Sequence, residues 1–143
     1  MNSKWIKVFL RLALGVAFLS AVADRFGLWP ATVSAWGSFD RFLIYTGTLA
    51  PWAPAALLPA LGWGITILEI VLGLWLLLGF KTRFTAQVSG FLILIFGLSM
   101  AVTSGIKGPL DYSVFSAAAA AFGLSLIPGK YLEIDQLLEK KKH

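Results

Sequence analysis

The sequence predicts an all-α integral membrane protein, a four-helix bundle within a single membrane domain that covers residues 1–143. Two features of composition support this: hydrophobic residues make up 58% of the chain and charged residues only 13%, and the mean hydropathy is +0.81. A soluble domain carries about 25% charged residues. Disorder requires many charges and few large apolar groups. Composition therefore excludes a soluble globular fold and a disordered chain.

Four apolar stretches define the predicted spans, since about 20 apolar residues cross about 30 Å of hydrocarbon. They run approximately over residues 5–23, 57–80, 84–102 and 112–127, and the last is short. An outer loop, 24–56, separates the first two, and a basic tail, 128–143, follows the fourth. The alternative for the first span is a signal peptide, because Ala21-Val22-Ala23 resembles a cleavage site. We expect the span to be retained, since a charged pair and an aromatic loop follow it at once.

The basic residues predict the orientation of the spans. Nine of the twelve lie in the N-terminal segment, the turn between spans two and three, or the tail. With four spans, these three regions share one side, which places both termini in the cytoplasm. The net charge of +5 then needs no nucleic-acid partner, and the basic tail faces anionic lipid headgroups.

The outer loop is rich in aromatic residues, which favour the membrane interface. Val33, Trp36, Phe39 or Asp40, and Leu43 recur at helical spacing. This pattern predicts a short amphipathic helix on the outer membrane surface. Two roles stay open for it: an anchor at the interface, or a lid over a cavity between the spans.

Small residues at spacings of three and four mark the faces that should join the helices, because close packing drives helix association in lipid. The expected seams are Arg11, Gly15, Phe18 and Val22 in span one; Gly62, Thr66, Glu69 and Gly73 in span two; Gln87, Gly90, Leu94, Gly97 and Ala101 in span three; and Ser113, Ser116, Ala120 and Gly123 in span four.

Glu69 is the most informative residue, since an ionised carboxylate within a span costs several kcal/mol unless it is paired or hydrated. We expect it to face the bundle interior and to pair with Arg11, or to be protonated and bonded to Thr66 or Gln87. The pair would either fix helix register or form a polar site for a ligand headgroup or a proton. By contrast, the outer-face charges are expected to form weak surface ion pairs: Asp24, Arg25, Asp40, Arg41, Lys107 and Asp111.

Redox and catalytic side chains are scarce. The chain has no Cys, and its one His is the last residue, His143. The sequence shows no metal-ligand spacing and no nucleophile–base pair, so we assign no catalytic residue and no metal site.

Two stretches resemble the DoxX/DoxD-like family of small four-span prokaryotic membrane proteins: Arg11 to Gly15 with Ala23-Asp24-Arg25-Phe26-Gly27, and Leu68-Glu69 to Gly73 with Gly79-Phe80-Lys81-Thr82-Arg83. The resemblance covers about the first hundred residues and picks out Arg11, Glu69, Gly73 and Arg83. It implies a location in the prokaryotic cytoplasmic (inner) membrane. It also implies quinone-linked redox chemistry, because a DoxD-like protein is a subunit of thiosulfate:quinone oxidoreductase.

On this resemblance we expect a quinone-associated membrane subunit that works with a redox partner subunit. Arg11 and Glu69 would bind the quinone and exchange its proton, while Phe18 and Trp63 hold the ring. The alternative is a non-enzymatic scaffold or a small-solute or proton-coupled carrier, which would need a homo-oligomer to form a path.

Overall fold

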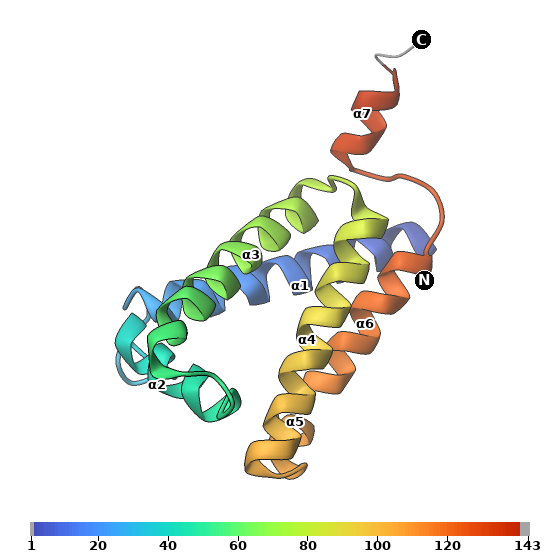
Figure 1. Cartoon of the computed structure of the whole chain (residues 1–143). Coiled ribbons are helices and arrows are strands. Elements are labelled where there is room, and N and C mark those ends of the chain that lie inside the picture. Colours follow the sequence, from blue (N-terminus) through green and yellow to red (C-terminus); the bar gives the residue numbers. More distant parts are fainter. Residues whose placement is uncertain (1, 141–143) are drawn as a thin grey trace.

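The computed structural model describes residues 2–140, and within that range the chain forms helices and connecting segments but no strand. The all-α prediction is confirmed. The helices, shown in Figure 1, are α1 (Ser3–Arg25), α2 (Phe39–Leu49), a 3-10 turn (Ala55–Leu57), α3 (Leu58–Leu78), α4 (Thr82–Ser104), α5 (Lys107–Asp111), α6 (Val114–Leu126) and α7 (Ile134–Lys140).

Three helical segments are long and apolar enough to cross a membrane: Ser3–Arg25, Ala55–Leu78 and Thr82–Ser104. The first and third extend two residues beyond each end of the predicted spans 5–23 and 84–102. The second is as long as the predicted span 57–80 and begins two residues earlier. The chain is thus a multi-pass membrane protein by the length and composition of its helices. The predicted fourth span corresponds to α6, which has 13 residues. At 1.5 Å per residue, α6 covers only about 20 Å, so a fourth crossing remains a prediction.

The long helices form two antiparallel pairs, α1 with α3 and α4 with α6, and the second pair crosses the first (Figure 1). The pairs diverge toward one end, where α2 and the loop 26–38 lie; we call this the loop end. The N-terminus and the segment 127–140 lie together at the opposite end, the tail end, where the Trp5 and Tyr131 rings meet at 5.4 Å.

The predicted seams of spans one and two are confirmed, because all eight of their residues are buried. Gly15 and Gly73 face each other so closely that a Cβ on Gly15 would lie 3.0 Å from the Gly73 carbonyl oxygen. In span three, Gly90 receives the ring of Phe122, and a Cβ there would approach that ring to 2.7 Å. Glycine thus permits the close packing within both helix pairs.

The seam predicted for span four is wrong. Gly123 is exposed, and no other side chain lies within 4 Å of the position that a Cβ would occupy there. Ser113 and Ser116 are exposed too, and the buried residues are instead Ala118, Ala121, Leu124 and Ser125. With small residues on all sides of this helix, composition could not single out the face that packs. The core that joins the pairs consists of Leu14, Phe18, Leu72, Leu76, Ala86, Ala121 and Leu124.

The predicted outer-loop helix exists, but it begins at Phe39 rather than near Val33. Ser38 caps it by accepting a hydrogen bond from the Arg41 N–H, and Gly37 precedes the cap at a φ of 69°. Phe42 of this helix is fully buried against α3. The helix is therefore part of the packed interior at the loop end.

Candidate functional site

Two buried polar clusters lie toward opposite ends of α1. The Arg25 cluster, at the loop end, consists of Arg25, Thr66 and Glu69. The Arg11 cluster, at the tail end, consists of Lys7, Arg11, Thr82 and Glu133. All seven side chains are buried. Because buried charges are costly unless paired, each cluster must be explained by its partners.

The Arg25 cluster bridges the last residue of α1 to the middle of α3. The Arg25 Nη2 atom lies 2.5 Å from the Glu69 Oε2 atom, and Arg25 Nη1 donates to the Thr66 hydroxyl at 2.9 Å. Thr66 in turn donates to the Gly62 carbonyl at 2.7 Å. The spacing of three residues places Thr66 and Glu69 on one face of α3, so a single guanidinium reaches both.

Aromatic rings from the loop end enclose the Arg25 guanidinium. Its central carbon lies 3.8 Å from the centroid of Phe42 and 5.4 Å from that of Trp36. Such cation–π contacts stabilise a desolvated cation. The Arg25 Nε atom is buried and has no hydrogen-bond partner within residues 2–140. The Arg25 guanidinium therefore keeps one buried nitrogen without a hydrogen-bond partner.

Asp24 fixes the loop that carries Trp36. Its carboxylate accepts hydrogen bonds from the main-chain N–H groups of Ala35 (2.8 Å), Trp36 (3.1 Å) and Gly37 (3.3 Å), and from the Ser34 hydroxyl. A carboxylate that accepts several N–H bonds holds a loop firmly, because bonds to charged groups are stronger than neutral ones. Asp24 thus positions the Trp36 ring beside Arg25.

A cleft of about 490 Å³ opens next to this aromatic wall, between the α2 region and the α4–α6 pair. Its lining is mainly aromatic and aliphatic: Ala35, Trp36, Tyr45, Phe96, Met100, Tyr112 and Val114. Burial raises the pKa of the Tyr45 phenol, and neighbouring Tyr112 adds to the shift, so Tyr45 is a neutral donor at physiological pH. Trp36 belongs both to this lining and to the enclosure of Arg25.

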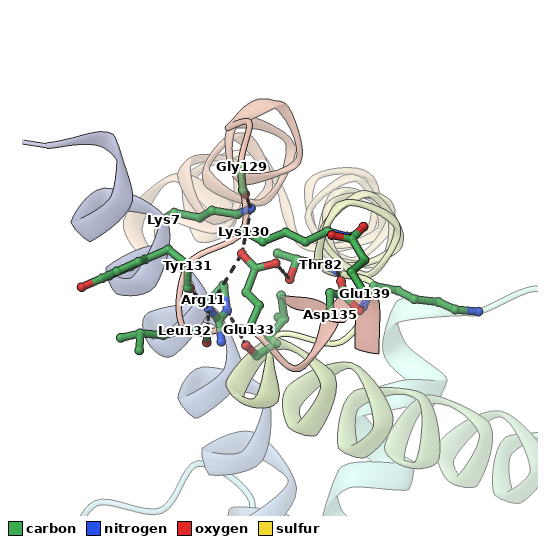
Figure 2. Close-up of polar contacts among 12 residues, drawn as sticks. Lys7, Arg11, Thr82, Gly129, Lys130, Tyr131, Leu132, Glu133, Asp135 and Glu139 are labelled. Carbon is green, nitrogen blue, oxygen red and sulfur yellow. Dashed lines mark hydrogen bonds and ion pairs between the residues drawn. The ribbon is translucent and has the colours of Figure 1, made fainter. Parts of the chain in front are cut away.

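The Arg11 cluster has a different construction (Figure 2). Arg11 donates to four main-chain carbonyls: Leu76 at 2.9 Å, Leu77 at 3.0 Å, Tyr131 at 3.1 Å and Leu132 at 2.9 Å. The first two belong to the last turn of α3, whose carbonyls lack helical partners and carry partial negative charge. Arg11 therefore caps α3 and ties the tail to it.

Glu133 completes this cluster. Its carboxylate lies 2.8 Å from Lys7 Nζ and 3.9 Å from Arg11 Nη1, and it accepts a hydrogen bond from the Thr82 hydroxyl at 3.0 Å (Figure 2). Gly79 makes room for this approach: it ends α3 at a φ of 70°, and a Cβ there would lie 2.7 Å from the Glu133 main chain. The segment that follows α6 is thus anchored to α1, α3 and α4.

The expected pairing of Arg11 with Glu69 is wrong, because α1 and α3 are antiparallel and the two residues lie in different clusters. Arg11 meets the C-terminal end of α3, whereas Glu69 lies one turn from Thr66, beside the end of α1. The expected surface position of Asp24 and Arg25 is wrong as well, since their exposed fractions are 6% and 1%. Helix α1 continues through both residues, which brings Arg25 beside Glu69.

The other predicted site residues do not converge on one place. Thr66 joins Glu69 as expected, but it accepts from Arg25. Phe18 belongs to the hydrophobic core, and Trp63 packs on Phe39 with ring centroids 4.6 Å apart. Gln87 lines a small cavity at the tail end, away from Glu69. Lys107 and Asp111, expected at the outer face, form an exposed ion pair of 2.5 Å in α5.

Sequence reasoning missed four residues of the two clusters as site residues: Lys7, Arg25, Thr82 and Glu133. It also missed Trp36 as the neighbour of Arg25. The sequence did contain a signal for Glu133. Lys7 and Arg11 are four residues apart on one face of an apolar helix, so they require an acidic partner near the N-terminal end of that helix. The acids at that end lie in the tail. The tail residues 141–143, expected at lipid headgroups, lie outside the described residues.

Comparison with known proteins identified no relative of this chain. No protein-family model matches the chain, and no curated protein or solved structure matches it.

Proposed function

We propose that the chain binds a hydrophobic ring compound of the quinone class in the cleft between α2 and the α4–α6 pair, as the membrane-embedded binding subunit of a redox system. The single observation that carries this is the position of Trp36, shared between an aromatic cleft and the buried pair of Arg25 and Glu69. The resemblance of the sequence to DoxX/DoxD-like proteins points in the same direction, toward quinone-linked chemistry.

The residues present suit such a ligand. Small-molecule sites enclose about 300–1,000 Å³, with mostly apolar walls and few polar groups. The cleft of about 490 Å³ lies within that range. Two phenols, Tyr45 and Tyr112, provide donors at the wall. Arg25, whose Nε atom has no partner, packs against the Trp36 ring of that wall, 5.4 Å from its centroid. When bound, a quinone would supply the electron-accepting ring, while this chain holds and orients it.

The chain has no Cys and no His before residue 143. On this proposal the electrons therefore come from a partner subunit, and the membrane orientation has both termini in the cytoplasm. Glu69 holds the charge of Arg25 in place and is the group through which a proton would reach the site. Arg11, whose three nitrogens each bind a main-chain carbonyl, takes no part in binding.

The test is binding of a short-chain benzoquinone to the full-length chain in lipid nanodiscs, measured by calorimetry. We expect Trp36→Ala to weaken binding at least ten-fold, because stacking on the ring is lost. Trp52→Ala, a change at an exposed ring outside the cleft, should leave binding unchanged. Glu69→Gln should abolish binding in a chain that stays folded. Failure of the unmodified protein to bind or to retain any quinone would refute the proposal.

A second candidate is a structural role for the same pair. Arg25 reaches Thr66 and Glu69 on α3 and packs on Phe42 of α2, so it fixes the relative positions of three helices. Under this reading the chain is a scaffold, and an apolar replacement of the pair retains all activity of the complex that contains it.

A further inference from the structure

A second cavity system lies at the tail end, far from the Arg25 cluster. A cavity of about 670 Å³ lies among Arg83, the end of α6 and the segment that follows it. A smaller one, of about 320 Å³, lies along the first turns of α4. Arg83 and Lys130 line both, so the two cavities form one groove, which we call the basic groove.

The charges around the basic groove are unbalanced. Lys81, Arg83 and Lys130 contribute three cations. The acids nearby are already used: Glu133 binds Lys7 and Thr82, and Asp135 accepts the main-chain N–H groups of Lys81 (2.9 Å) and Thr82 (3.3 Å). Three acids line the groove as well: Glu133, Asp135 and Glu139. Because Glu133 is paired with Lys7 and Glu139 with Lys130, Lys81 and Arg83 face only Asp135, which leaves one cation in excess. Arg83 makes no hydrogen bond or ion pair within residues 2–140.

Apolar side chains border the same groove. Phe84 lines the smaller cavity and Leu126 the larger one, with exposed fractions of 57% and 75%. Both belong to apolar helices whose outer surfaces suit acyl chains. A cationic recess beside exposed apolar surface matches a phospholipid, with its phosphate in the recess and its chains along the helices.

We propose that the basic groove is a binding site for the phosphate headgroup of an anionic phospholipid, held chiefly by Arg83. Arg83 is suited to this because a guanidinium binds two phosphate oxygens at once. The site is independent of the cleft and of any quinone. It explains why the tail is anchored so firmly: Lys7 binds the Gly129 carbonyl and Arg11 binds those of Tyr131 and Leu132, so the main chain is held on either side of Lys130 and forms one wall of the groove.

The experiment is native mass spectrometry of the full-length chain, mixed with equal amounts of phosphatidylglycerol and phosphatidylcholine of identical acyl chains. We expect the unmodified chain to retain phosphatidylglycerol preferentially. Arg83→Gln should lower that retention about five-fold, since one basic residue near an anionic surface contributes about that factor. Arg41→Gln, at an exposed arginine of the loop end, is the matched control and should have no effect.

Glu139→Gln supplies a test of opposite sign, because it removes the acid that competes for Lys130 and should strengthen retention. Arg83 is exposed, so its replacement leaves the fold intact, which circular dichroism checks. Equal retention of both lipids, or equal loss in the Arg83 and Arg41 variants, would overturn the proposal. An added arm with inorganic phosphate identifies the source: phosphate that displaces the lipid and binds alone would show a free-phosphate site and overturn the lipid assignment.

Discussion

Arg11 and Arg25 lie on the same helix, both almost fully buried, yet the protein uses them differently. Arg11 donates to four main-chain carbonyls and lies within reach of one carboxylate. Arg25 has one hydroxyl, one carboxylate and two aromatic rings as partners, and its Nε has none within residues 2–140. Each nitrogen of Arg11 binds a main-chain carbonyl, which no side-chain substitution removes. Arg25 instead keeps one nitrogen without a partner and packs against Trp36, a residue of the cleft wall.

The comparison separates a structural cation from a functional one. Main-chain carbonyls are present in every sequence and cannot change their charge, so a cation bound to them serves to hold chain segments together. A carboxylate can exchange a proton, and a hydroxyl can change partner. A buried arginine paired with such side chains, next to space for a ligand, is the better candidate for function.

The largest expected effect on the free energy of unfolding comes from replacing Arg11. Arg11→Met leaves four main-chain carbonyls without their side-chain donor and removes one of the two cations beside Glu133. Loss of one partner of a buried charge costs about 3–5 kcal/mol. We expect that decrease in the free energy of unfolding, measured by denaturant titration in micelles, together with faster proteolysis after residue 127. Arg41→Met, at an exposed position, serves as the control. A decrease below about 1 kcal/mol would show that the carbonyl bonds contribute little.

The Arg25 pair should behave differently in a double-mutant cycle. Arg25→Leu or Glu69→Leu alone leaves an uncompensated buried charge and should cost about 3 kcal/mol, but the double Leu variant should unfold within about 1 kcal/mol of the unmodified chain. Quinone binding by that folded double variant then decides between the two proposed functions. Loss of binding supports the site, and full retention supports the structural role. Additive costs of the two single changes would contradict the pairing itself.

Replacing Asp24 tests whether a single carboxylate holds the loop that forms one wall of the cleft. Asp24→Ala removes the acceptor of three N–H groups and one hydroxyl, and we expect a loss of about 2 kcal/mol. The sharper measurement is hydrogen exchange, which should increase at residues 34–37 while residues 76–82 stay protected. Asp40→Ala is a suitable control, because Asp40 is exposed at the start of α2. Unchanged exchange at 34–37 would mean that aromatic packing alone holds the loop.

The sequence predicted the helical class, the three long spans and the seam between α1 and α3, because these depend on periodicity and residue size. Gly15 and Gly73 were found for that reason, and both lie where α1 and α3 pack closely. Glu69 was found because an acid in an apolar span is conspicuous. These are local properties of the chain, and local rules suffice for them.

The partners of the charges depend on register and on distant segments, which local rules do not determine. Glu69 pairs with Arg25 because α1 extends beyond its apolar stretch, and Arg11 binds residues that are more than a hundred positions away. The small residues on every side of α6 also provided no means of choosing its packed face. The cleft itself arises from the divergence of two helix pairs, which no pattern within one helix predicts.

The smallest expected effect is a loss of stability at alkaline pH, caused by Tyr45 at the loop end. Burial raises the pKa of this phenol in the folded chain. The unfolded chain therefore loses the proton first, so the stabilising contribution is complete below a pH of about 10 and is lost as pH rises through the folded value. Thermal unfolding in detergent should show a decline in stability above that pH, less steep in Tyr45→Phe. Identical alkaline profiles for the two chains would mean that solvent already reaches the hydroxyl in the cleft.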